Sequence, residues 1–175
     1  MINFKNMKWY GWLLLAVVII LVPLGGFLLL PFLKEKVKTP FTGSDQTRGK
    51  RNNNPMNLRQ TDINWRGESK EDLDPEFEEF DSMMLGVRAG LRNMRTWYNR
   101  GNKNLEKLIS IWAPDHENDT NSYIEFMERE TGLDRNKEFE WTNEVVYPIA
   151  KAMCQIESLF NLERSLYDEA WNNID

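Results

Sequence analysis

The sequence predicts a mainly α-helical domain of the α+β kind, with one small β-hairpin, preceded by one N-terminal transmembrane helix. Residues 9–33 carry no charged side chain, residues 34–47 lack apolar periodicity, and the remainder places apolar residues at helical spacing. We therefore divide the chain into a flank (1–8), a membrane anchor (9–33), a linker (34–47) and a domain (48–175).

The anchor is the run from Trp9 to Leu33, which is long enough to cross a bilayer, since about 20 apolar residues span the hydrocarbon core. Trp9, Tyr10 and Trp12 lie at one end, where aromatic rings favour the membrane interface. A cleaved signal peptide has an apolar region of only about 7–15 residues, so we expect a retained anchor and a lipid bilayer as a partner. By a small margin, the count of Lys and Arg places the C-terminal part on the cytoplasmic side.

The linker is rich in Gly, Pro, Ser and Thr. The domain after it shows apolar residues at helical spacing in four segments. These are Met83–Tyr98, Leu105–Trp112, Thr120–Thr131 and a last helix from about Thr142 to Phe160. Asp81 and Ser82 are candidate N-caps of the first helix, and Gly132 is a candidate stop signal of the third. Phe77–Phe80 and the segment around Trp65 predict the hairpin.

Composition excludes several classes of function. Lys and Arg number 22 against 27 Asp and Glu, a net charge of -5, so we expect no nucleic-acid partner. Cys154 is the single cysteine, which excludes an internal disulfide. With His116 as the single histidine, the usual zinc site of clustered ligands is excluded as well. We therefore expect no metal and no cofactor.

Glu157 lies beside the apolar stripe of the last helix. Ile149, Met153, Ile156 and Phe160 mark that stripe, and Glu157 is at its edge. Desolvation next to apolar groups raises a carboxyl pKa, which a glycosidase acid needs in order to arrive protonated near neutral pH. The spacing alone leaves open a solvated Glu that pairs with a neighbouring cation.

Four motifs occur in a fixed order along the domain. Arg51–Ser69 reads RNNNPMNLRQTDINWRGES, Phe77–Trp97 begins FEEFDS, Trp112–Ile124 reads WAPDHENDTNSYI, and Gln155–Asn161 reads QIESLFN. The last resembles the Glu-Ser-x-Phe signature of soluble lytic transglycosylases. The first two resemble bacterial glucosaminidases of the autolysin and flagellar type, in which the catalytic helix comes first rather than last.

The whole arrangement resembles a family of phage virion-associated proteins with cell-wall lysis domains. The resemblance implies a lysozyme-like fold, here circularly permuted, which is feasible because domain termini often lie close together. It also implies a peptidoglycan-cleaving activity with Glu157 as general acid and then base. At the last motif the family often has His-Glu-Asn-Gly, whereas residues 156–159 here are Ile-Glu-Ser-Leu.

We expect five further residues to contact the glycan. Asn54 and Asn57 would hydrogen-bond N-acetyl groups, Arg59 would hold a carboxylate through its planar fork, and Trp65 and Tyr123 would stack on sugar rings. Each of these residues also has a structural alternative. The asparagines could form a turn, Arg59 could form a surface ion pair, and Trp65 and Tyr123 could belong to the core. We expect Trp112 in the core.

The reaction type depends on a second carboxylate. Glycoside hydrolases usually employ two, and Glu68, Glu78 and Glu79 are candidates that no spacing singles out. A lytic transglycosylase works with a single Glu, so we expect a transglycosylase acting on MurNAc-GlcNAc strands during phage entry, anchored in the virion membrane. The alternatives are an inactive structural protein that contacts other virion proteins, and a glucosaminidase or muramidase endolysin with a signal anchor in the host inner membrane.

Overall fold

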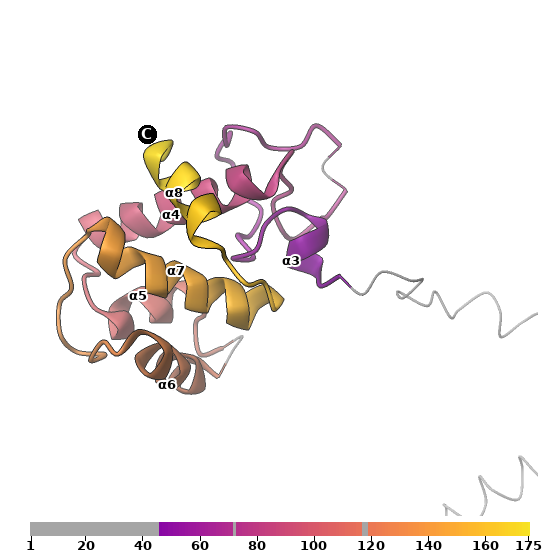
Figure 1. The fold of residues 1–175 in the computed structure, drawn as a ribbon. Helices are drawn as coiled ribbons and strands as arrows, with labels where there is room; N and C mark the ends of the chain where they lie inside the picture. The colour runs from indigo at the N-terminus through magenta and orange to yellow at the C-terminus, as the bar shows by residue number, and fades with distance from the viewer. Residues whose placement is uncertain (1–45, 72, 117–118) are drawn as a thin grey trace, which may run out of the picture. The chain divides into compact units, whose positions relative to one another are not determined.

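The computed structural model describes residues 46–71, 73–116 and 119–175, and Asp45–Asp175 form one compact unit. Within the described residues, helices run in the order α3, α4, α5, α6, α7 and α8 (Figure 1). Their bounds are Arg48–Arg51, Met83–Asn99, Leu105–Trp112, Thr120–Thr131, Asn143–Ser158 and Arg164–Asn172. The four predicted helices are present, and the end of the chain forms α8 as a separate helix.

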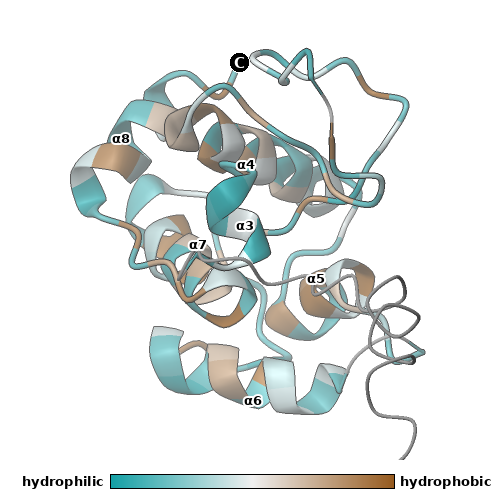
Figure 2. Ribbon diagram, turned by 90° about the vertical axis from the view of Figure 1, so that its right-hand side faces the viewer, coloured by the Kyte–Doolittle hydropathy of each residue, from teal (hydrophilic) through white to brown (hydrophobic). Residues whose placement is uncertain are grey.

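Two helices organise the packing. The long helix α7 packs against α6, α8 and α3, while α4 packs against α8 and α5. Hydrophobic and hydrophilic residues alternate along α5, α6 and α7, as expected of helices with one buried face (Figure 2). The main core includes Leu91 and Met94 of α4, Ile109 of α5, and Ile149 and Met153 of α7, all fully buried. Burial of these side chains drives the assembly of the helices.

Polar side chains define the helix ends. The Ser82 side chain accepts a hydrogen bond from the Leu85 N–H, as predicted, and Asn104, Asp119 and Thr142 cap the next three long helices in the same way. Gly132 ends α6 with a left-handed φ of 71°, also as predicted. These boundaries are therefore encoded locally.

The predicted β-hairpin is wrong. The described residues contain no strand, and only two isolated bridges form, between Arg59 and Phe77 and between Glu68 and Phe80. Residues 77–81 exchange backbone hydrogen bonds with residues 52–58 on one side and with residues 67–69 on the other. Because these few backbone groups are divided between two neighbours, neither pairing is long enough to become a ladder.

The predicted transmembrane helix, residues 9–33, lies outside the described residues, as do most of the predicted linker and the flank. Where the structure is described, every helix is too short or too polar to cross a bilayer.

Helix α4 approaches a loop rich in asparagine, residues 52–58, which we call the asparagine loop. A Cβ atom on Gly86 would lie 1.7 Å from the carbonyl oxygen of Asn53, and one on Gly90 would lie 2.5 Å from Sδ of Met56. Glycine at 86 is therefore required by contact between two backbones, not by an unusual φ.

Substitution of Gly86 by Ala should lower the free energy of unfolding by about 2 kcal/mol or more, because the added methyl group meets a rigid backbone carbonyl. The matched substitution Gly90→Ala should cost less, since it meets the flexible end of a Met side chain. Denaturant unfolding of both variants measures the difference. Equal stability of Gly86→Ala and the unsubstituted protein would contradict the packing described.

Candidate functional site

Glu157 lies in the last turn of α7, next to the buried face of that helix. Cys154 and Met153, one turn before it, are fully buried, whereas Glu157 itself is partly exposed. Its side chain borders a pocket of about 550 Å³, which we call the acid pocket. The other lining residues are Asp119, Ser122, Tyr123, Glu125, Phe126, Arg129 and Ile156. The carboxyl group is therefore desolvated on one side and open on the other.

Both carboxylate oxygens of Glu157 accept a hydrogen bond. The Tyr123 hydroxyl donates to Oε1 at 3.0 Å, and the Asn57 side-chain amide donates to Oε2 at 3.0 Å. The same amide nitrogen of Asn57 also donates to the Glu157 main-chain oxygen at 2.9 Å. Donors from α6 and from the asparagine loop thus fix the orientation of an acid on α7.

Burial raises the pKa of the Glu157 carboxyl above its usual range. Hydrogen bonds from Asn57, Tyr123 and Trp112, and the positive charge of Arg59, act in the opposite direction without cancelling it. Burial also raises the pKa of Tyr123 well above its usual value, so the phenol stays protonated and remains a donor. A carboxyl group of raised pKa beside an open pocket is suited to proton donation.

A second, smaller pocket lies beside the donors of Glu157. It has a volume of about 220 Å³, and we call it the tryptophan pocket. Its lining is Asn57, Leu58, Arg59, Thr61, Asn93, Trp97, Ile111 and Trp112. Asn57 and Trp112 line this pocket and also donate hydrogen bonds to Glu157, so the tryptophan pocket is connected to the acid through these two side chains.

Asn57 is positioned by the conformation of the asparagine loop. Asn53 and Asn57 have left-handed φ values of 51° and 49°, which asparagine tolerates better than most residues. The fully buried Asn54 side chain accepts from the Leu58 N–H and donates to the carbonyl oxygens of Leu58 and Glu78. Asn53 and Asn54 thus shape the loop, and Asn57 reaches the carboxylate of Glu157.

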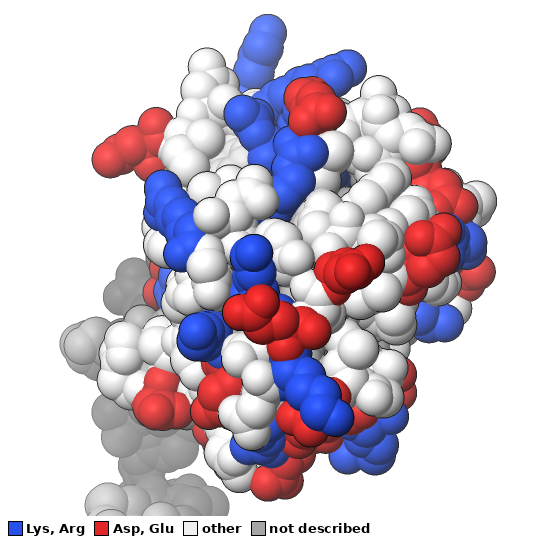
Figure 3. Space-filling view, turned by 90° about the vertical axis from the view of Figure 1, so that its left-hand side faces the viewer, with Lys and Arg blue, Asp and Glu red and all other residues white. Residues whose placement is uncertain are grey.

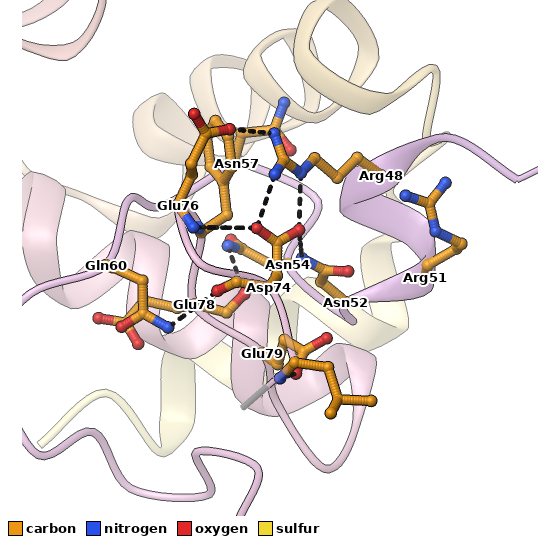
Figure 4. Close-up of polar contacts among 12 residues, drawn as sticks. Arg48, Arg51, Asn52, Asn54, Asn57, Gln60, Asp74, Glu76, Glu78 and Glu79 are labelled. Carbon is orange, nitrogen blue, oxygen red and sulfur yellow. Dashed lines mark hydrogen bonds and ion pairs between the residues drawn. The ribbon is translucent and has the colours of Figure 1, made fainter. Parts of the chain in front are cut away.

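An ionic clamp holds α3 against the loop that follows it (Figure 4). The Arg48 guanidinium donates to both Asp74 carboxylate oxygens at 2.6 and 2.8 Å, and Asn52 donates to Asp74 at 2.8 Å. Arg48 also pairs with Glu76 at 2.7 Å. Burial alone would raise the pKa of Asp74, but the hydrogen bonds from Arg48, Asn52 and backbone amides outweigh it and lower the pKa to about 2.

Helix α3 also touches the end of α7, where the acid lies. The Thr47 hydroxyl donates to the Ser158 carbonyl at 2.7 Å, and a Cβ atom on Gly49 would lie 2.0 Å from Ser158 Oγ. Leu159 then ends α7 with a left-handed φ of 50°, a conformation that costs a non-glycine residue about 1–2 kcal/mol. A glycine at this position would adopt the same φ without that cost.

The structure brings together Glu157, Asn57, Tyr123 and Arg59 of the predicted site residues. It does not bring Asn54 or Trp65 to the acid. Asn54 is fully buried with its amide bound to backbone groups, and Trp65 is 4 % exposed in a small cluster with Leu58, Phe80 and Ala89. Asn54 therefore has the structural role of an asparagine turn, and Trp65 that of a core residue.

Tyr123 acts through its hydroxyl, not by presenting an open ring face, since it is 7 % exposed. Trp112, expected in the core, is half-buried, lines the tryptophan pocket and donates to Glu157. Its helical spacing to Leu108 and Ile109 indicates burial, and nothing in the local sequence signals a neighbour 45 positions later.

The three candidate second carboxylates are engaged elsewhere. Glu68 accepts from the Trp65 N–H, Glu78 from Thr61 and Trp65, and Glu79 from the Leu73 N–H. The acid pocket instead contains Asp119 and Glu125 beside Glu157. Asp119 accepts from the Ser122 hydroxyl and N–H, which lowers the pKa of its carboxyl.

The clamp can be tested by Asp74→Asn. Because the pKa of Asp74 is lower in the folded than in the unfolded chain, its stabilisation is complete above the ordinary value of 3.8 and is lost as pH falls through about 2. The substitution should therefore cost between about 1 and 2 kcal/mol at pH 7 and much less near pH 2. Glu76→Gln, which alters the exposed partner of Arg48, should cost less than about 0.5 kcal/mol in the same unfolding experiment.

The protonation of Glu157 can be measured directly by NMR titration of its carboxyl carbon. The pKa should lie above the ordinary value of 4.5, and Tyr123→Phe should raise it further by removing a donor to the ionised form. Tyr147→Phe is the matched control, because that hydroxyl donates to the Leu162 carbonyl instead. A pKa at or below 4.5 in the unsubstituted protein would contradict the description of the site.

Comparison with known proteins places these residues in a wider context. No family model matches the chain. Protein P5 of Pseudoalteromonas phage PM2 is 41% identical to it over 120 residues, which are 66% of this chain and 73% of that protein. The chain therefore belongs to the same family as this phage protein.

Proposed function

We propose that the chain is a peptidoglycan-cleaving enzyme, a lytic transglycosylase with Glu157 as its single acid and base. The observation that carries the proposal is the state of that carboxyl group: its pKa is raised, both oxygens are held by hydrogen bonds, and it borders an open pocket. The resemblance of the four sequence motifs to cell-wall lysis domains supports the same substrate.

The reaction begins when protonated Glu157 donates its proton to the glycosidic oxygen, and the bond from that oxygen to C1 of the muramic acid breaks. The 6-hydroxyl of the same sugar then attacks C1 and gives its proton to the Glu157 carboxylate, which restores the acid. The product is a 1,6-anhydro ring, and no water is consumed. Hydrogen bonds from Asn57 and Tyr123 stabilise the carboxylate between the two steps.

The two pockets suit the two sides of a cleaved glycan. The tryptophan pocket is lined by Trp97, Trp112 and Arg59, a combination of aromatic surface and hydrogen-bond donors that fits a sugar ring. The acid pocket offers Asp119, Ser122 and Arg129 beside Glu157. We assign substrate contacts to Asn57, Arg59, Trp112 and Tyr123.

A hydrolase is the second candidate, and one observation favours it. Asp119 lines the same pocket as Glu157, and its lowered pKa keeps it ionised at neutral pH. An ionised carboxylate across from a protonated one is the pair that two-acid glycosidases employ. In that case the released sugars carry ordinary reducing ends.

We place this activity in a phage particle that opens the host cell wall during entry. The support is the shared family with a phage protein and the resemblance to virion-associated lysis domains. Interspersed Lys, Arg, Asp and Glu cover the face of the helical unit in Figure 3, without an extended field of one sign.

The test is digestion of purified cell walls by the full chain, with mass spectrometry of the soluble products. We expect 1,6-anhydro-capped muropeptides, and Glu157→Gln should reduce their release by about 10²–10⁴-fold, the usual contribution of a general acid. Glu144→Gln is the matched control, since Glu144 is an exposed residue in the first turn of the same helix.

If the products carry reducing ends and Asp119→Asn abolishes their release, the enzyme is a hydrolase and not a transglycosylase. Wall binding without any release of sugars would exclude an enzyme and indicate an inactive structural protein.

A further inference from the structure

A third pocket lies between α6 and α7, and the proposed catalytic role leaves it unused. We call it the outer pocket; its volume is about 630 Å³. Its lining is Phe126, Glu130, Tyr147, Pro148, Lys151, Ala152 and Gln155.

The outer pocket continues from the acid pocket. Phe126 lines both of them, and Gln155 on α7 is only two residues from Glu157. Lys151 precedes Glu157 by six residues, which is about 9 Å along a helix. A molecule bound at Glu157 therefore reaches Lys151 by following the groove between α6 and α7.

The chemistry of this groove differs from that of the tryptophan pocket. Its lining combines the apolar Phe126, Tyr147 and Ala152 with two charged side chains, Lys151 on α7 and Glu130 on α6. An apolar lining that also carries an ammonium and a carboxylate fits an extended peptide that bears both a carboxylate and an amine. Both side chains are exposed, and Glu130 also pairs with Arg129 at 3.3 Å. A charged peptide can therefore add an ionic contact to each of them, whereas a neutral sugar can add none.

We propose that this groove binds the peptide stem attached to the muramic acid of peptidoglycan. The inference rests on the proposed function, because it takes the glycan to lie at Glu157. The stem begins on the lactyl group of the sugar beside the scissile bond. Three extended residues span about 10 Å, which is the reach needed to bring a stem carboxylate to Lys151. Glu130 then accepts a hydrogen bond from a stem amine.

The test compares two substrates: glycan strands with their stems and strands stripped of stems by an amidase. Lys151→Glu should lower kcat/KM on the stem-bearing strands by about threefold to fivefold, the equivalent of one exposed charged contact, with the loss confined to those strands. Lys107→Glu, at an exposed position on α5, is the matched control for the same change of charge and should affect neither substrate.

An equal loss on both substrates, or no loss on either, would overturn the peptide groove while leaving cleavage at Glu157 intact. Binding supplies a measurement that is independent of catalysis. Free stem peptide, L-Ala-D-Glu-diaminopimelate, added to the full chain should shift the NMR signals of Lys151 and Ala152, and Lys151→Glu should weaken its affinity. Absence of these shifts would overturn the inference, whereas loss of cleavage of every glycan with the shifts intact would overturn the proposed function alone.

Discussion

The contact on which the candidate site depends is the one between Asn57 and Glu157. One amide nitrogen of Asn57 donates to the main-chain oxygen and to the carboxylate of the same residue. It joins positions 100 residues apart, and it fixes the last turn of α7 and its side chain together. A side chain held in this way would lose little further conformational freedom in the proposed reaction, which is how preorganisation favours catalysis.

That contact requires an ordered approach of α3 and the asparagine loop to α7. Close packing of Gly49 on Ser158 and of Gly86 on Asn53 leaves no room for a side chain at either glycine. The Arg48–Asp74 pair adds an ion pair between a partly exposed guanidinium and a buried carboxylate, and Asn54 satisfies three buried backbone groups. Buried polar groups without partners would be costly, so these contacts hold one conformation of an irregular segment.

Burial and hydrogen bonding compete at Glu157, and their balance sets its chemistry. Desolvation raises the pKa of the carboxyl, while donors from three separate segments moderate the rise by stabilising the ionised form. An acid that must give up a proton and take it back needs both effects. Cys154 is buried one turn before Glu157, and there desolvation and the nearby Glu157 charge outweigh a backbone hydrogen bond, so the pKa of its thiol is raised far beyond the neutral range.

By itself, the sequence determined the four helices α4, α5, α6 and α7 and the residues that cap them, because spacing of apolar residues and capping side chains are local signals. It did not predict α3, and it placed the end of α7 at Phe160 instead of Ser158. It also placed Glu157 at the edge of the buried face of α7, and it indicated Asn57, Arg59 and Tyr123 as neighbours through motif resemblance. Only the tertiary structure decided that Asn54 and Trp65 are buried supports and that Trp112 reaches the acid. It also decided that residues 77–81 divide their hydrogen bonds between two segments instead of forming a hairpin. Those outcomes depend on contacts between residues far apart in the chain, and no local pattern of residues specifies which distant group will occupy the remaining space.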